Sequence, residues 1–281
     1  MKYIITSDTH FDFLFKDSNL SPTKILNSLR HNKLLDYFSP KDDEPHTLIV
    51  AGDIGHNPEQ NVKVLRCLKS YFKYSDIIIV FGNHDYYNTS RGQRKNFPNI
   101  HIKEEYILNL YRESGIIVLN GDIVEHYGKK IMGFPAWYDG SYLTEFGYED
   151  SVESLWESTM NDSRLIPLSK GNGMYYLLKF QMDKVMDIPE QKVDMIITHF
   201  CPLVGDRYVA PEFLGEYSNA FYQFNGDYLR DKFSPDIWVY GHTHQGVTFR
   251  EDGIKYYCNP LGYPVEFNNK IRFGELKAEI I

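Results

Sequence analysis

The chain has few cysteines and no cysteine motif. Three cysteines, Cys67, Cys201 and Cys258, occur in 281 residues, and no two of them have CxxC spacing. An odd number of widely spaced cysteines argues against a disulfide framework and against a cysteine-based metal site. We therefore expect reduced thiols and a cytoplasmic protein.

Long apolar runs and an excess of positive charge are also missing. No apolar run approaches the roughly 18 residues that a membrane-spanning helix needs, and Met1–Thr6 leads into a predicted strand without a signal-peptide core. Lysine and arginine total 30 against 38 acidic residues, a formal net charge of −8. We expect no membrane partner, and a negative overall field disfavours nucleic acid unless a local patch binds it.

The remaining composition is that of a globular protein, with 42% apolar and 24% charged residues. We predict one domain over residues 1–281, because nothing between the predicted elements resembles a flexible linker. Residues 136–187 differ from the rest, since they are rich in aromatic side chains and lack strand–helix alternation. We predict an insertion here, with two helices, packed over one edge of the core and forming part of a cleft wall.

Strands and helices alternate in the first third of the chain. Apolar, β-branched runs predict strands at 2–7, 47–51 and 77–81, separated by helices at 22–38 and 57–74. This βαβαβ order implies a parallel sheet with right-handed crossovers.

The rest of the chain adds shorter elements. A helix is predicted at 101–114, short strands at 116–119, 122–127 and 130–134, and buried strands at 193–198 and 236–240. The tail, 246–281, is predicted to form short antiparallel strands with turns at Asp252-Gly253 and Asn268-Asn269.

Five of the predicted strands end in polar side chains that are capable of binding metals. Ligands of open α/β sheets bind at the carboxyl ends of the strands. The side chains found there are Asp8 and His10, Asp53, Asn83 and His84, His199, and His242 and His244.

Carboxylate, imidazole and amide oxygen together suit a divalent transition metal such as Mn, Fe or Zn. A carboxylate can bridge two ions, and two ions roughly 3.5–4 Å apart can clamp both oxygens of an in-line phosphoryl displacement.

These strand ends resemble the motifs of the calcineurin-like metallophosphoesterase superfamily. The motifs are Asp8-Thr9-His10, Gly52-Asp53, Gly82-Asn83-His84-Asp85, Thr198-His199 and Gly241-His242-Thr243-His244, in the order of the family. The chain is similar in particular to a bacterial and phage subgroup of predicted phosphohydrolases, through Met160-Asn161-Asp162, Asp236-Ile237-Trp238 and Cys258-Asn259-Pro260-Leu261-Gly262-Tyr263.

The resemblance implies an α/β fold, a four-layer αββα sandwich of two mixed sheets flanked by helices, in which the antiparallel tail would complete the second sheet. It also implies two metal ions: Asp8, His10 and His244 would hold one, Asn83, His199 and His242 the other, and Asp53 would bridge them. A metal-bridging hydroxide would then attack the phosphorus of a phosphoester in line, and His84 would protonate the leaving oxygen.

Two other functions fit parts of this pattern. One is a non-catalytic scaffold on the same fold, although such proteins lose metal ligands and this chain retains them all. The other is a nuclease, with nucleic acid as substrate, although no lysine or arginine run lies beside the motifs. The substrate stays open among monoesters, diesters, pyrophosphates and phosphoproteins.

Several residues near the motifs have a functional and a structural interpretation. Asp85 could orient His84 or stabilise its turn, and Arg207 could bind phosphate or lie on the surface. The structural interpretation is preferred for His56, Asp12 and Asn259.

Overall fold

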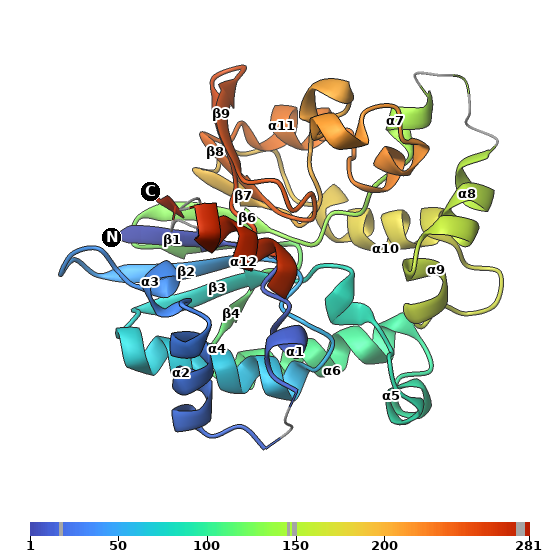
Figure 1. Ribbon diagram of the computed structural model, residues 1–281. Coiled ribbons are helices and arrows are strands. Elements are labelled where there is room, and N and C mark those ends of the chain that lie inside the picture. Colours follow the sequence, from blue (N-terminus) through green and yellow to red (C-terminus); the bar gives the residue numbers. More distant parts are fainter. Residues whose placement is uncertain (17–18, 145–146, 148–150, 274–278) are drawn as a thin grey trace.

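Two β-sheets lie face to face with helices on their outer sides (Figure 1). The computed structural model describes residues 1–16, 19–144, 147, 151–273 and 279–281. The first sheet has the strand order β11-β1-β2-β3-β4 and the second the order β5-β6-β7-β8-β10-β9. Strands β1–β4 are parallel to one another, as are β6, β7, β8 and β10, and antiparallel β11, β5 and β9 make both sheets mixed. The predicted α/β class and two-sheet sandwich are confirmed.

The strands are short. The first sheet contains β1 (Lys2–Thr6), β2 (His46–Ala51), β3 (Asp76–Val80), β4 (Ile117–Val118) and β11 (Glu279–Ile280). The second contains β5 (Asp122–His126), β6 (Lys129–Gly133), β7 (Met195–Ile197), β8 (Ile237–Tyr240), β9 (Val247–Glu251) and β10 (Ile254–Cys258).

Two groups of helices flank the sheets in Figure 1. The group beside the first sheet comprises α1 (Phe11–Leu14), α2 (Pro22–His31), α3 (Leu35–Phe38), α4 (Pro58–Phe72), α5 (Arg91–Asn96) and α6 (Ile100–Glu113). The other comprises α7 (Ser141–Thr144), α8 (Val152–Thr159), α9 (Asp162–Leu165), α10 (Met174–Met186) and α11 (Asp227–Phe233), and α12 (Pro264–Phe273) follows near the C-terminus. None of the described helices is both long and apolar enough to cross a bilayer.

Local sequence signals set the starts of two helices. Ser21 accepts a hydrogen bond from the backbone N–H of Lys24 at the start of α2, and Asn57 does the same for Gln60 at the start of α4. In both cases proline occupies the first helical position, where its missing N–H costs nothing.

Alternate residues of the strands fill two apolar layers. One layer lies between the sheets and includes Ile5, Ile49, Ile78, Ile131, Ile197 and Val239, all fully buried. The residues beside them in sequence face the helices and include Ile4, Leu48, Ile77, Ile196 and Trp238. Burying each of these side chains contributes about 1.5–3 kcal/mol, so the strand ends are held on a rigid base.

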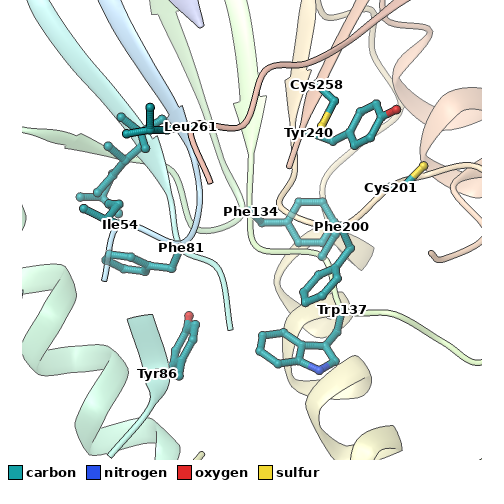
Figure 2. Packing of buried hydrophobic residues seen from close by; sticks show 14 of the residues in the cluster. Ile54, Phe81, Tyr86, Phe134, Trp137, Phe200, Cys201, Tyr240, Cys258 and Leu261 are labelled. Atoms are coloured by element: carbon teal, nitrogen blue, oxygen red, sulfur yellow. The ribbon is translucent and has the colours of Figure 1, made fainter. Parts of the chain in front are cut away.

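An aromatic cluster joins the two sheets just below the ends of their strands (Figure 2). Phe81 follows β3 and its ring contacts that of Tyr86, with centroids 6.0 Å apart. Tyr86 contacts Trp137 (6.0 Å), and Trp137 contacts Phe200 beyond β7 (5.2 Å). This cluster fixes the distance between the loops that follow β3 and β7.

The prediction for the tail, 246–281, is partly wrong. The hairpin of β9 and β10 turns at Asp252-Gly253 as predicted, with φ of 47° and 84°. The predicted turn at Asn268-Asn269 lies instead inside α12. Pro264 begins this helix and Phe267 is buried against the core, so tertiary packing overrides the turn preference of the two asparagines.

Three other predictions also need correction. The helix predicted at 22–38 is divided into α2 and α3, because Lys33 adopts a left-handed conformation (φ 55°) between them. Within 136–187, four described helices replace the predicted two. Strand β11 joins the first sheet beside β1 and not the second sheet. The division into one domain with an insertion at 136–187 stays a prediction.

Gly133 tests how tightly the two sheets pack. A Cβ atom at Gly133 of β6 would lie 2.8 Å from Leu119 and 2.9 Å from Val80 of β3. We expect Gly133→Ala to lower the free energy of unfolding by about 1–3 kcal/mol through overpacking, as measured by urea denaturation. The control is Gly92→Ala in α5, where a Cβ would lie 3.8 Å from Ser90 Oγ and alanine favours the helix. Equal stability of Gly133→Ala and the parent would contradict this packing.

Candidate functional site

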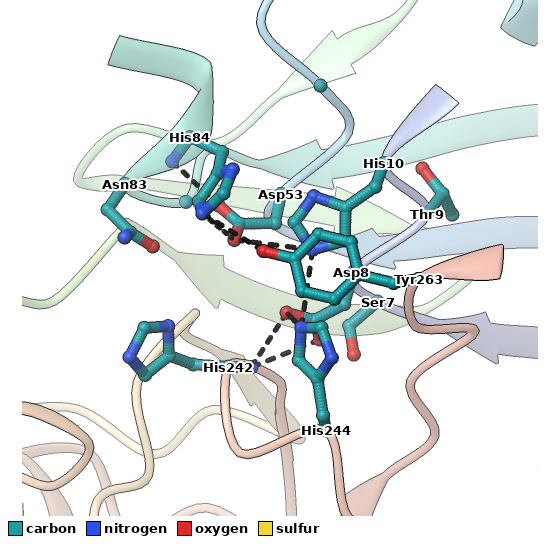
Figure 3. Close-up of polar contacts among 12 residues, drawn as sticks. Ser7, Asp8, Thr9, His10, Asp53, Asn83, His84, His242, His244 and Tyr263 are labelled. Carbon is teal, nitrogen blue, oxygen red and sulfur yellow. Dashed lines mark hydrogen bonds and ion pairs between the residues drawn. The ribbon is translucent and has the colours of Figure 1, made fainter. Parts of the chain in front are cut away.

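The predicted strand-end residues come together at one edge of the sandwich, between the two sheets (Figure 3). Three groups of side chains could each hold a metal ion, because the donor atoms within each group lie within 4.8 Å of one another. The groups are Asp8, His10 and His244; His10, Asp53 and His84; and Asp53, His199 and His242. Asn83 joins the third group, since its Oδ1 lies 3.2 Å from His199 Nε2. Each predicted site residue is therefore part of one continuous cluster.

Five of these residues have left-handed backbone conformations. The φ angles are 50° at Asp8, 40° at His10, 54° at Asp53, 67° at His242 and 53° at His244. Such conformations cost about 1–3 kcal/mol each in non-glycine residues and gather at functional sites. The turns aim successive side chains at the same point between the sheets.

Gly82 permits this close approach of the loops. A Cβ at Gly82 would lie 2.1 Å from Asp53 Oδ1 and 2.7 Å from His199 Nε2. Any side chain there would occupy the space in which the donor atoms meet, so the glycine before Asn83 is required by the site itself.

The first donor group centres on His10 and His244. Their Nε2 atoms are 3.2 Å apart, and His244 Nε2 lies 3.3 Å from Asp8 Oδ1. Asp53 Oδ2 lies 3.8 Å from His10 Nε2. The Asp8 carboxylate also accepts the backbone N–H of His242 at 3.0 and 3.1 Å, which joins the loops after β1 and β8.

The second donor group centres on His199. Its Nε2 lies 3.2 Å from His242 Nδ1 and 3.4 Å from Asp53 Oδ1. Asp53 thus faces both groups, with Oδ1 toward His199 and Oδ2 toward His10. A carboxylate in this position can bridge two cations.

The outer ring nitrogens of three histidines have acceptors of their own. His199 Nδ1 lies 2.9 Å from the Ala51 carbonyl, His242 Nε2 lies 3.1 Å from the Phe221 carbonyl, and His244 Nδ1 lies 2.6 Å from Glu266 Oε2. We assign one ring proton to each of these nitrogens, which leaves the inner nitrogen to bind either a second proton or a metal ion. Metal-binding histidines are oriented in this way, so the residues present fit divalent ions.

The protein alone already favours positive charge at this point. Although burial opposes protonation, Asp53 raises the pKa of His199 to about 9, and Asp8 raises the pKa of His244 to about 10. Burial lowers the pKa of His10 and His242 to about 3. The carboxylates therefore attract cations to the two donor groups. The imidazoles of His10 and His242 stay neutral, and a metal ion would take the place of the extra proton on His199 and His244.

His84 is oriented by residues for which the sequence favoured a structural interpretation. His84 Nδ1 lies 2.8 Å from His56 Nε2, and His56 Nδ1 lies 3.0 Å from Asp12 Oδ2. If His56 donates to Asp12, its Nε2 accepts the Nδ1–H of His84. The His84 Nε2 atom then faces Tyr263 OH (3.5 Å) and Asp53 Oδ2 (3.9 Å). His56 thus contacts His84 directly, and Asp12 contacts it through His56.

Asp162 orients Asn83 from a distance of 79 residues in the chain. The fully buried Asp162 carboxylate accepts Asn83 Nδ2–H at 2.9 Å, and it also accepts the hydroxyls of Tyr87 and Tyr138. Because its amide nitrogen is held by Asp162, Asn83 turns its oxygen toward His199. No local signal in the sequence predicts this contact, although Met160-Asn161-Asp162 belongs to the subgroup pattern.

The remaining ambiguous residues have structural roles. Asp85 accepts the backbone N–H groups of Gly82, Ile54 and Gly55, so it stabilises the turn, and burial raises its pKa to about 7. Arg207 is exposed and pairs with Glu251 at 3.1 Å.

A pocket of about 610 Å³ opens beside the cluster. Asp53, Asn83, His84, His242 and His244 form one end of it. Its other walls come from 159–161, from 208–223, from Tyr263 just before α12 and from Glu266 in the first turn of α12. The volume is within the range of small-molecule sites.

Comparisons with known proteins agree with this geometry. The chain is 27% identical over 293 residues to an uncharacterised protein of Acanthamoeba polyphaga mimivirus, covering 96% of this chain and 93% of that protein. Its fold is similar to that of the phosphopantetheinyl hydrolase of Mycobacterium tuberculosis, with a TM-score of 0.70, 18% identity, and coverage of 99% of this chain and 95% of that one. The model of the calcineurin-like phosphoesterase family matches residues 1–246. The chain therefore belongs to the calcineurin-like phosphoesterase family.

Proposed function

We propose that this metal-dependent phosphoesterase uses two divalent ions, held by seven side chains. Asp8, His10 and His244 form one set, Asn83, His199 and His242 the other, and Asp53 bridges them. The observation that carries the proposal is the orientation of His199, His242 and His244, whose outer nitrogens are each held by an acceptor while their inner nitrogens converge. Mn, Fe and Zn suit this set of donors.

When bound, such ions supply Lewis acidity: they activate water and neutralise charge on the phosphoryl oxygens. The protein's own contribution is orientation. Asp53 presents one oxygen to each set, and its Oδ1 also accepts the backbone N–H of His84 at 2.9 Å. This bond links the bridging carboxylate to the loop that carries His84.

His84 is proposed to assist the leaving group. Its Nδ1 is held by His56, so its Nε2 faces the pocket. Burial lowers the pKa of His84, so its protonated ring gives up a proton readily. The Nε2 atom can then donate to the oxygen of the departing alcohol while His56 accepts the Nδ1–H. His56 and Asp12 are therefore positioning residues for His84.

The two alternatives have less support. A non-catalytic scaffold needs no oriented His84, yet His84 is held by a chain of two side chains and borders a pocket of small-molecule size. A nuclease needs cationic side chains along a groove, and the described lining of the pocket contains no lysine or arginine.

The metal content of the protein tests the dinuclear centre. After Mn reconstitution we expect two ions per chain by elemental analysis. Asp53→Asn should lower this number and abolish phosphatase activity, because a neutral amide cannot replace an anion shared by two cations. The exposed Asp43→Asn serves as the matched control. A saturated wild type with one ion, or an Asp53→Asn variant that retains both, would contradict the model.

The leaving group tests the role of His84. We expect His84→Gln to retain both ions and to lower kcat by about 10²–10⁴-fold on an alkyl phosphate. The loss should be smaller on p-nitrophenyl phosphate, whose leaving group departs without a proton. His31→Ala, at the exposed end of α2, is the control. Equal losses on the two esters would exclude proton donation by His84.

Chelator competition tests the link between Asp162 and Asn83. Asp162→Asn replaces an acceptor with a group that also donates, so Asn83 should lose its fixed orientation. We expect one ion to bind about 10–100-fold more weakly, measured by titration with a chelator. Asp183→Asn, on an exposed face of α10, is the control, and thermal unfolding in chelator reports any change in the fold. Unchanged affinity for both ions would refute this role.

A further inference from the structure

The pocket beside the metal centre has no lysine or arginine in its described wall. Apart from Asp53 and the histidines, the ionisable acidic or basic groups among its lining residues are the carboxylates of Glu216 and Glu266. Glu266 accepts a hydrogen bond from His244, whereas Glu216 is exposed and forms no ion pair with the described residues. A bound phosphoester would therefore meet cations at one end of the pocket and an unpaired carboxylate elsewhere.

Cationic side chains beside the pocket wall are directed to other partners. Lys270 of α12 acts on the charge of Glu266, but its Nζ donates to the carbonyls of Pro260 and Leu261 and does not line the pocket. Arg207 precedes Tyr208 of the pocket wall, but its guanidinium pairs with Glu251. Arg164 donates to the side-chain oxygen of Asn161, at 2.8 Å, and does not line the pocket. None of the three is placed to neutralise a second anionic group of a ligand.

The rest of the wall is aromatic or uncharged. Tyr87, Tyr208, Phe213, Tyr222 and Tyr263 line it, and Phe213 is 53% exposed. Aromatic rings bind apolar groups through burial and cationic groups through their faces. The faces of these rings do not attract an anionic group in the same way.

We propose that this pocket selects small phosphoesters whose organic part carries no second anionic group and is uncharged or cationic. The proposal rests on the proposed function, since the phosphate must lie at the metal end. It disfavours nucleic acid and nucleoside di- and triphosphates as substrates, because their further phosphates would meet Glu216 without a compensating cation.

Three aryl phosphates of matched shape test the proposal: the 4-ethylphenyl, 4-(carboxymethyl)phenyl and 4-(2-aminoethyl)phenyl esters. One methylene group in the carboxymethyl ester and two in the aminoethyl ester separate the charge from the ring, so the phenols have similar leaving abilities. At low salt we expect kcat/KM for the carboxylated ester to be about tenfold below that of the ethyl ester, and the aminoethyl ester to equal or exceed it. The difference should shrink at high salt through screening.

Two variants localise the effect. Glu216→Lys should raise the ratio of kcat/KM for the carboxylated ester over the ethyl ester by about tenfold. Glu212→Lys makes the same change of charge on the same exposed loop, outside the pocket lining, and should leave the ratio within about twofold. Equal shifts in the two variants would show a general charge effect and overturn the assignment to Glu216.

Calorimetry with the corresponding benzylphosphonates separates this proposal from the proposed function. Phosphonates are not hydrolysed, so their affinities report the charge preference even without turnover. Weaker binding of the carboxylated phosphonate supports the proposal even if none of the esters is hydrolysed, an outcome that would refute the proposed function alone. Equal or tighter binding of the carboxylated phosphonate, with turnover retained, overturns the charge selection and leaves the phosphoesterase intact.

Discussion

Histidine ring nitrogens and carboxylate oxygens converge between the two sheets, and the rest of the structure depends on this constraint. Pairs of ring nitrogens 3.2 Å apart, such as His10–His244 and His199–His242, repel one another unless a proton or a cation lies between them. Five left-handed residues build the cluster, at a combined cost of ~5–15 kcal/mol, which equals the net stability of a typical domain. Only a large buried core and bound cations can offset such a cost. The apolar layer between the sheets and the aromatic cluster under the strand ends are therefore as necessary to the site as its ligands.

Much of this arrangement could be predicted from the sequence, because its signals are local. Runs such as Ile77–Val80 predict buried strands, and parallel strands bring their carboxyl ends to a common edge, so Asp53 and Asn83 had to lie close together. Contacts that arise only in the folded chain could not be predicted. Asp162 reaches Asn83, and His56 reaches His84, without any periodicity or spacing that would signal either contact. The helix α12 was missed for a similar reason, since its helical state depends on burial of Phe267.

The segment 136–187 contributes both to the wall of the pocket and to the orientation of Asn83. Residues 159–161 line the pocket, and the next residue, Asp162, holds Asn83. Tyr138 donates to Asp162 and accepts Trp156 Nε1–H, both at 2.5 Å, so the carboxylate is fixed inside a buried network. A shift of this wall on ligand binding would therefore move the side chain that orients Asn83. The size of the pocket and the affinity of the set Asn83, His199 and His242 for a metal ion are thus expected to vary together.

The distribution of charge along the pocket would orient a bound phosphoester. The chain carries a formal net charge of −8, and the described pocket wall adds carboxylates and no lysine or arginine. Under the proposed function, the strong positive potential along the described wall comes from the metal end, where Asp8 and Asp53 would hold the cations. A phosphoester can then enter in one orientation, with its phosphate toward Asp53 and its organic part toward Phe213 and Glu216. Orientation by a single cationic centre requires no arginine clamp, and it leaves the aromatic wall free to discriminate among the organic groups.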